Sequence, residues 1–132
     1  MESLQTAEPA AQRLSAAALR SFFRIAEAWK LTGEERRRVL GGVAKQTLYN
    51  WAARPENTTL TGDQLDRISY LLGIYKSLHI LFSRPEQADS WIRRPNDGAP
   101  FGHKTAADIL FSGRMEDMLL VRRYLDAARS PW

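Results

Sequence analysis

The first part of the chain alternates apolar and polar residues with a helical period. From Ser15 to Trp29, apolar side chains recur at intervals of three and four residues, which is typical of an amphipathic helix capped at Ser15. The members of this stripe are Leu19, Phe22, Phe23, Ala26 and Trp29. Residues 1–14 show no such period and include a proline, so we expect a flexible N-terminal arm there.

Two short helices should follow. Thr32 and Glu35 have the spacing of a capping box, which predicts a helix that reaches Leu40 and ends at Gly41-Gly42. A further helix should begin near Val43 and stop before Pro55, because a residue that precedes proline is disfavoured in the helical conformation.

A second capping box, Thr61 with Gln64, predicts a long helix that reaches Phe82. Its apolar stripe consists of Leu65, Ile68, Leu71, Leu72, Tyr75, Leu78 and Phe82. Tyr70, Ile74 and Ile80 lie off this stripe, so more than one face of the helix needs burial. We therefore expect a homodimer.

The C-terminal part also has helical signals. Ser83 and Glu86 predict the cap of a short helix to about Arg93, and 95–105 should be irregular. A helix over 106–111 should end at Gly113, and a last helix over 115–128 has an apolar face. That face consists of Met118, Val121, Leu125 and Ala128. No segment alternates with period two, so the fold class is all-α.

The helix before Pro55 carries side chains suited to reading DNA. Placed at 100° steps, Ala44, Leu48 and Trp51 share one side. The outward face and its flanks consist of Lys45, Gln46, Thr47, Tyr49, Asn50 and Arg54, preceded by Arg37 in the shorter helix. Amides pair with adenine and cations reach guanine or phosphate, which favours a helix-turn-helix. The alternative is an ordinary helix, since any exposed face is polar.

The amino-acid composition limits the kinds of ligand and partner that we expect. The 132 residues carry a net charge of +4, and 1–60 hold nine basic residues against six acidic ones. There is no cysteine and there are only two histidines, so we expect neither a metal site nor a cofactor. Uninterrupted apolar stretches are short, which favours a cytoplasmic chain without a membrane partner.

Catalytic motifs are not found. The sequence has no G-x-S-x-G and no H-E-x-x-H motif. The loop 98–105 ends in Lys-Thr, but its glycine spacing differs from that of a phosphate-binding loop and no apolar strand precedes it. We expect that the protein is not an enzyme.

The order of motifs resembles the Xre/MbcA/ParS-like antitoxin family. The segment QTLYNW is followed by LDRISYLLGIYKSLHILF, then WIRRPN, then PFGHKTAADILFSGRMEDMLLVRRYLDAA. The family pattern, roughly W-L-x-x-P-N, then F-x-G, a helix, a glycine and a final helix, is matched at Trp91, Pro95, Asn96, Phe101, Gly102 and Gly113. The resemblance covers the chain from about Leu19 onward.

This resemblance implies that two regions of the chain have different functions. It implies a helix-turn-helix DNA-binding region over 15–60 and a toxin-binding and dimerisation domain over 61–132. The implied partners are operator DNA, whose binding represses the protein's own operon, and a RES-type toxin that consumes NAD.

The toxin contact should include motif residues and the C-terminal tail. Arg and Trp are enriched at interface hot spots, so the tail could enter a pocket built for an anionic dinucleotide. The candidate residues are Trp91, Asn96, Phe101, Arg122, Arg129 and Trp132. One alternative is a stand-alone helix-turn-helix regulator with a C-terminal dimerisation domain, and another is a small nucleotide-handling enzyme.

Overall fold

The computed structural model describes residues 2–97 and 101–129, and its described residues form helices and connecting loops, with one isolated β-bridge between Pro95 and Thr105. The predicted all-α fold is therefore confirmed. In chain order the elements are α1 (Glu2–Ala28), α2 (Gly33–Val39), α3 (Lys45–Ala53), η1 (Pro55–Asn57), α4 (Gly62–Leu81), α5 (Pro85–Ser90), η2 (Trp91–Arg93), α6 (Ala106–Leu110) and α7 (Met115–Arg129).

Helix α1 is longer than the sequence pattern predicted. It begins at Glu2, so the expected cap at Ser15 is wrong, and the segment before Ser15 is helical rather than an irregular arm. That segment is rich in Ala, Glu and Gln, which favour a helix without any apolar stripe. Ser15 is buried, and its hydroxyl oxygen accepts a hydrogen bond from the Leu60 N–H at 2.8 Å, just ahead of α4.

The pair α2 and α3 forms where the sequence predicted it. Thr32 and Glu35 make the predicted capping box at the start of α2. Gly41 and Gly42 both have positive φ, 92° and 82°, and reverse the chain between the two helices. The predicted boundaries of α3 are accurate to within about two residues.

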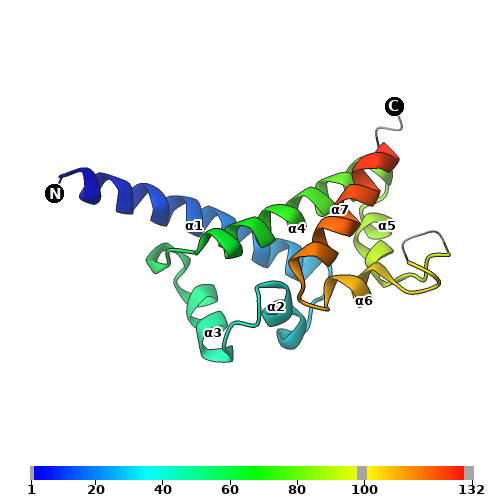
Figure 1. Ribbon diagram of the computed structural model, residues 1–132, viewed down its shortest axis with the longest axis horizontal. Coiled ribbons are helices and arrows are strands. Elements are labelled where there is room, and N and C mark those ends of the chain that lie inside the picture. The colour runs from blue at the N-terminus through cyan, green and yellow to red at the C-terminus, as the bar shows by residue number, and fades with distance from the viewer. Residues whose placement is uncertain (1, 98–100, 130–132) are drawn as a thin grey trace.

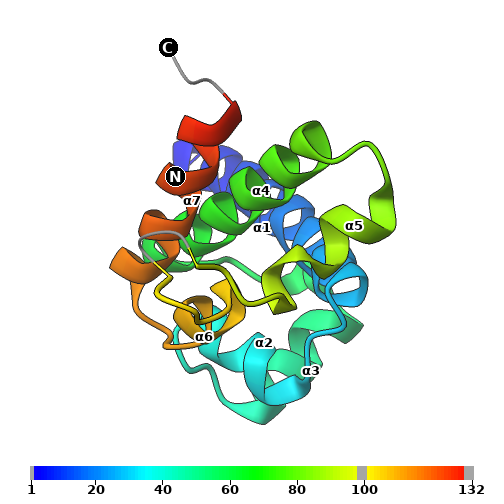
Figure 2. The same cartoon turned by 90° about the vertical axis from the view of Figure 1, so that its right-hand side faces the viewer.

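Helix α4 is the centre of the molecule. It lies between α1 and α7, as the end-on view in Figure 2 shows, while α2 and α3 occupy one side of the molecule in Figure 1. Ile68, Leu71, Ile74 and Leu78 are buried. Ile74, which we expected to need a second chain, is 0% exposed, because α1 and α7 cover two faces of α4. Of the three residues off the stripe, Ile80 is the clearly exposed one, at 52%.

The C-terminal helices pack along α4, with contacts from Arg67 to Ser77. The predicted cap at Ser83 is wrong: Arg84 occupies the N-cap position and Pro85 the first turn, where its missing N–H is not needed. Helix α6 ends before Gly113, whose φ is 81°, as predicted. On α7, Met118, Val121 and Leu125 are buried, but Ala128 is exposed because it lies beyond the end of this contact face.

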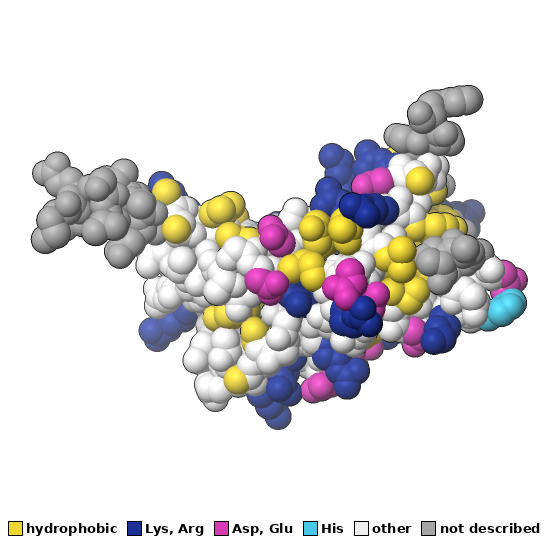
Figure 3. Space-filling model, in the orientation of Figure 1, with side chains coloured by type: hydrophobic (Ala, Val, Ile, Leu, Met, Phe, Trp, Pro, Cys, Tyr) yellow, Lys and Arg dark blue, Asp and Glu magenta, His cyan; other side chains and the backbone are white. Residues whose placement is uncertain are grey.

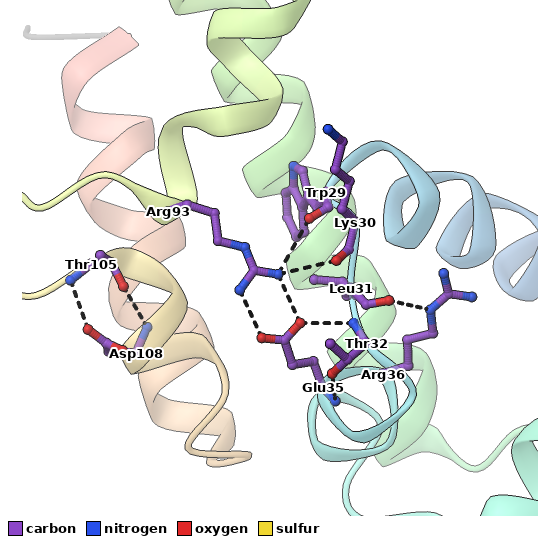
Figure 4. A network of polar contacts seen from close by, with 9 residues as sticks. All are labelled: Trp29, Lys30, Leu31, Thr32, Glu35, Arg36, Arg93, Thr105 and Asp108. Carbon is purple, nitrogen blue, oxygen red and sulfur yellow. Dashed lines mark hydrogen bonds and ion pairs between the residues drawn. The ribbon is translucent and has the colours of Figure 1, made fainter.

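Polar contacts join α2 to the C-terminal helices. The Arg93 guanidinium donates two hydrogen bonds to the Glu35 carboxylate, both at 2.8 Å, and reaches the carbonyl oxygens of Trp29 and Lys30 at 3.5 Å (Figure 4). Arg67 of α4 donates to the Gly113 carbonyl at 2.7 Å. The Arg93–Glu35 bridge therefore ties α2 to η2, and the Arg67 bond ties α4 to the turn between α6 and α7.

Among the described helices, none has the length and apolar character needed to cross a lipid bilayer.

Candidate nucleic-acid interface and partner-binding face

Helix α3 lies on the surface of the molecule. Leu48 and Trp51 are half-buried and pack against the core, on the side that the sequence predicted. No residue of α3 is fully buried, and Ala44 caps the helix without a side-chain hydrogen bond. The helix is thus held by one narrow apolar edge, which leaves most of its circumference to solvent.

The exposed face of α3 carries the predicted reading residues. Tyr49 is 69% exposed, and Gln46 and Asn50 are exposed beside it. The Gln46 side-chain Nε2 donates a hydrogen bond to the Asn50 side-chain Oδ1 at 3.0 Å, which aligns two amides one helical turn apart. Such amides can pair with adenine edges, so the arrangement has the chemistry of a major-groove reader.

Helix α3 forms a ridge between two hollows. One hollow, of about 720 Å³, is lined by Tyr49, Asn50, Trp51, Ala53, Arg54, Asn57, Thr58 and Thr59. The other, of about 560 Å³, is lined by Phe23, Leu31, Gly33, Glu34, Arg36, Arg37, Lys45, Leu48, Tyr49 and Ala52. Tyr49 borders both. A ridge with recesses on either side fits a groove whose two walls are phosphate strands.

Arg37, a predicted DNA-binding residue, makes bonds within the protein. Its Nε donates to the Val43 carbonyl at 2.8 Å, and its Nη1 pairs with Glu34 at 3.1 Å. These bonds hold the turn between α2 and α3 and leave the Arg37 side chain about one-third exposed. Its first role is therefore to orient α3. Lys45 and Arg54 are exposed, and Thr47 is half-buried.

Positive side chains gather along the edge that α2 and α3 form. Figure 3 shows Lys and Arg side chains over these helices and a second group over α7, with acidic side chains between them. Glu34 neutralises part of the first group through Arg37 and Arg38. Lys45 has no ion pair among the described residues, so its charge is available to an anion.

Aromatic rings form a cluster at the C-terminal end of the fold. Trp91 of η2 lies nearly parallel to Tyr124 of α7, with ring centroids 6.3 Å apart. Phe101 meets both rings edge-on, at 5.7 and 4.9 Å. Phe101 is only 2% exposed, so it supports the other rings from inside the core and is not itself a contact surface. Trp91 and Tyr124 are half-buried and remain accessible.

The other predicted partner-binding residues lie apart from this cluster or beyond the described chain. The Asn96 backbone closes the 96–104 loop through bonds with His103 and Lys104. Arg122 lies over the Tyr70 ring at 5.7 Å, and Arg129 donates to Ser77 at 3.4 Å, so both reach back over α4. Trp132 lies outside the described residues.

The junction between α2 and the C-terminal helices contains an ion pair, Glu35 with Arg93, whose two members both have shifted pKa values. The paired hydrogen bonds from Arg93 lower the pKa of Glu35 from 4.5 to about 2, although burial opposes this shift. Glu35 in turn raises the pKa of Arg93. Phe111 packs under the Arg93 guanidinium, 5.3 Å from its ring centroid. This bridge fixes how the candidate nucleic-acid interface sits on the C-terminal helices.

Several residues of these surfaces were not found from the sequence. Asn57, Thr58 and Thr59 line the first hollow because η1 turns the chain back beside α3, and no local pattern indicates that turn. Tyr124 was missed because it is not a member of the predicted apolar stripe of the last helix. Its signal is the pairing with Trp91, which only the tertiary fold brings about.

Comparison with known proteins agrees with this geometry. The antitoxin Xre-like helix-turn-helix domain matches residues 8–73, which include α2 and α3. The antitoxin Xre/MbcA/ParS C-terminal toxin-binding domain matches residues 77–130, which include the aromatic cluster. The first match ends at residue 73 and the second begins at residue 77, both within α4. The uncharacterized protein y4oB of Sinorhizobium fredii is 42% identical over 113 residues, covering 86% of this chain and 84% of that protein.

Proposed function

The chain belongs to the Xre-like antitoxin family, with a helix-turn-helix domain and a toxin-binding domain, and we propose that it neutralises a RES-type, NAD-consuming toxin and represses its own operon. The proposed repression of the operon is supported by the exposed α3 ridge. The toxin-binding half is supported by the accessible rings of Trp91 and Tyr124 on the domain that matches the toxin-binding family.

Operator recognition uses Gln46, Tyr49 and Asn50 on the exposed face of α3. Lys45 and Arg54 bind phosphates on either side, and Thr47 and Arg37 support the ridge. One short helix reads few base pairs, so the operator-bound form is a homodimer with one ridge in each half-site. Light scattering that gives the mass of a single 15.0 kDa chain at micromolar concentration would contradict the dimer.

The DNA test is a gel shift on the operon's own promoter. Replacing Gln46 and Asn50 with Ala should weaken binding by about 1–3 kcal/mol per lost base contact and blur sequence preference. Both residues are exposed, so stability should change little. Unchanged affinity and preference in this double variant would remove α3 as the reading helix.

Toxin neutralisation uses the C-terminal tail together with the Trp91–Tyr124 surface. Arg122 and Arg129 lie on the same side of α4, and we propose that they guide Trp132 toward the anionic-substrate pocket of the toxin. Deleting 127–132 should leave folding and DNA binding nearly intact, because terminal residues contribute little to a core. Loss of a Trp or Arg hot spot weakens an interface by 2 kcal/mol or more, about thirtyfold.

Growth of toxin-expressing cells measures this effect at matched antitoxin levels. Poor protection by the truncated chain is expected. Equal protection by both chains would reject the tail and leave the Trp91–Tyr124 surface as the inhibitory element.

A further inference from the structure

Three hollows that share lining residues follow one another from the side of α3 along α1, and together we call them the furrow. It starts at the hollow of about 560 Å³ beside Lys45 and continues into one of about 620 Å³, with which it shares Phe23, Arg36 and Ala52. Arg20 then lies between that hollow and a third, of about 400 Å³, whose lining includes Arg13. The furrow therefore joins the candidate nucleic-acid interface to the N-terminal half of α1.

Three arginines line the α1 side of this furrow. Arg13, Arg20 and Arg24 are seven and four residues apart, which places them within about 40° of one another around the helix axis. All three are exposed. Among the side chains that the structure describes, which begin at Pro9, none forms an ion pair with these three arginines, and Arg24 makes one hydrogen bond, to Ser21 at 3.3 Å. This row presents three uncompensated positive charges.

The acidic residues along the furrow are mostly neutralised by other partners. Glu27 pairs with Arg36 at 3.3 Å, and Glu34 pairs with Arg37 at 3.1 Å. Glu56 lines the third hollow and has no ion pair in the described part of the chain. The furrow as a whole therefore has a positive potential, which suits a continuous anionic partner.

We propose that Arg13, Arg20 and Arg24 bind the sugar-phosphate backbone of the operator beyond the base pairs that α3 reads. This inference rests on the proposed DNA-binding function and extends its contact surface. A helix in the major groove has a phosphate strand on each side, and the furrow opens on the Lys45 side of α3. The arginine row continues from that side along α1.

The dimensions of the row agree with such a contact. From Arg13 to Arg24 the helix advances eleven residues, which is about 16 Å at 1.5 Å per residue. Along one DNA strand, 3.4 Å of axis separate successive phosphates, so the row spans about five nucleotides. The opposite hollow, lined by Arg54, Asn57 and Thr58, offers donors to the other strand.

The competing occupant is an acidic protein segment that packs on Phe23 and Ala52 at the base of the furrow. Phosphate is the better match, because the three arginines stand on the exposed side of a helix and extend over about 16 Å of it, at intervals of seven and four residues, as contacts to a continuous nucleic-acid strand would require. A peptide would instead use the apolar floor.

The test measures the salt dependence of promoter binding by the full chain and by the triple variant Arg13→Gln, Arg20→Gln, Arg24→Gln. Each lost phosphate contact lowers the slope of log K against log salt by about 0.9, so the variant should lose about 2–3 units. Raising salt fourfold should then weaken the wild type about fortyfold more than the variant. A charge-matched control, Arg84→Gln, Lys104→Gln, Arg123→Gln, alters exposed residues of the other domain and should keep the wild-type slope.

Binding to a short and to a long duplex distinguishes failure of the arginine row from failure of the proposed DNA-binding function. On duplexes trimmed to the bases that α3 protects, the wild type and the triple variant should bind alike, and they should differ only when about five flanking base pairs are present. Failure of the wild type to bind any promoter DNA would contradict the proposed function. If the wild type binds the long duplex but the triple variant shows the same salt slope, the arginine row is not a phosphate contact. A triple variant that loses toxin binding while its DNA binding is unchanged would also overturn the arginine row and leave the proposed function standing.

Discussion

Replacing Glu35 with Ala should loosen the junction between α2 and the C-terminal helices. The carboxylate receives two hydrogen bonds from Arg93 and one from the Thr32 N–H at 2.9 Å, so the substitution removes both the bridge and half of the capping box. The Glu35 side chain is 20% exposed, and the Arg93 side chain is 40% exposed. The pair is therefore partly screened by water but cannot be fully solvated without opening the junction.

Two estimates give the size of the effect. A hydrogen bond to a charged group contributes about 1.5–3 kcal/mol, and removal of its partner leaves Arg93 without a counterion. The lowered pKa of Glu35 sets an upper limit of about 3 kcal/mol on its charge interactions, and solvent screening of Arg93 reduces this figure. We therefore expect the free energy of unfolding to fall by about 2 kcal/mol.

Urea unfolding measures this loss, with Glu34→Ala as the control. Glu34 also pairs with arginines of α2, but its carboxylate is 57% exposed, so its removal should cost less than about 1 kcal/mol. Equal destabilisation by the two substitutions would refute the assignment of the bridge as the principal junction contact.

The same pair predicts a pH dependence. The folded-state pKa of Glu35 lies below its unfolded value, so its stabilising contribution is fully present above about pH 4.5 and is lost as the pH falls toward 2. The stability difference between the wild type and Glu35→Ala should shrink over that window. A difference that is constant from pH 6 to pH 3 would contradict the charged bridge.

Two further substitutions test the packing of α2 and α3. Gly113→Ala should lower the free energy of unfolding by about 1–2 kcal/mol, because the φ of Gly113 is 81° and a Cβ there would lie 3.2 Å from the Arg38 carbonyl oxygen. The control is Gly33→Ala, whose Cβ meets open space, and it should be nearly neutral in thermal unfolding. Leu48→Ala should cost about 1–3 kcal/mol, less than a fully buried leucine, since Leu48 is half-buried, and its loss of promoter binding should track the fraction unfolded. A Leu48→Ala protein that is fully folded yet cannot bind promoter DNA would contradict a purely structural role for this residue.

Local signals determined most of the helix boundaries. The capping boxes at Thr32 and Thr61 and the glycines at 41–42 and 113 act within a few residues, so the sequence predicted these starts and stops correctly. The start of α1 carries no comparable signal, because a run of good helix formers needs no particular cap. The start of α5 was misplaced because Pro85 occupies the first turn, where the pattern had favoured Ser83 as a cap.

Tertiary contacts determined the burial and the partners of several residues that the hydrophobic pattern could not predict. Ile74 was predicted to face a second chain, but α4 is covered on two sides within one chain, and a single-stripe view of an amphipathic helix does not anticipate that. Arg37 and Phe101 were predicted as contacts, yet one holds a turn and the other fills the core. The Glu35–Arg93 bridge joins residues far apart in sequence, and no spacing rule connects them.

We propose that this antitoxin neutralises an NAD-consuming enzyme by direct binding. The most direct measurement is the NAD content of cells that express the proposed RES-type partner enzyme, alone or with this chain, combined with affinity purification of the tagged enzyme. We predict that NAD falls with the enzyme alone, that it is maintained on co-expression, and that the two proteins then purify as one complex. Depletion of NAD that continues despite a stable complex, or protection without any complex, would contradict the account.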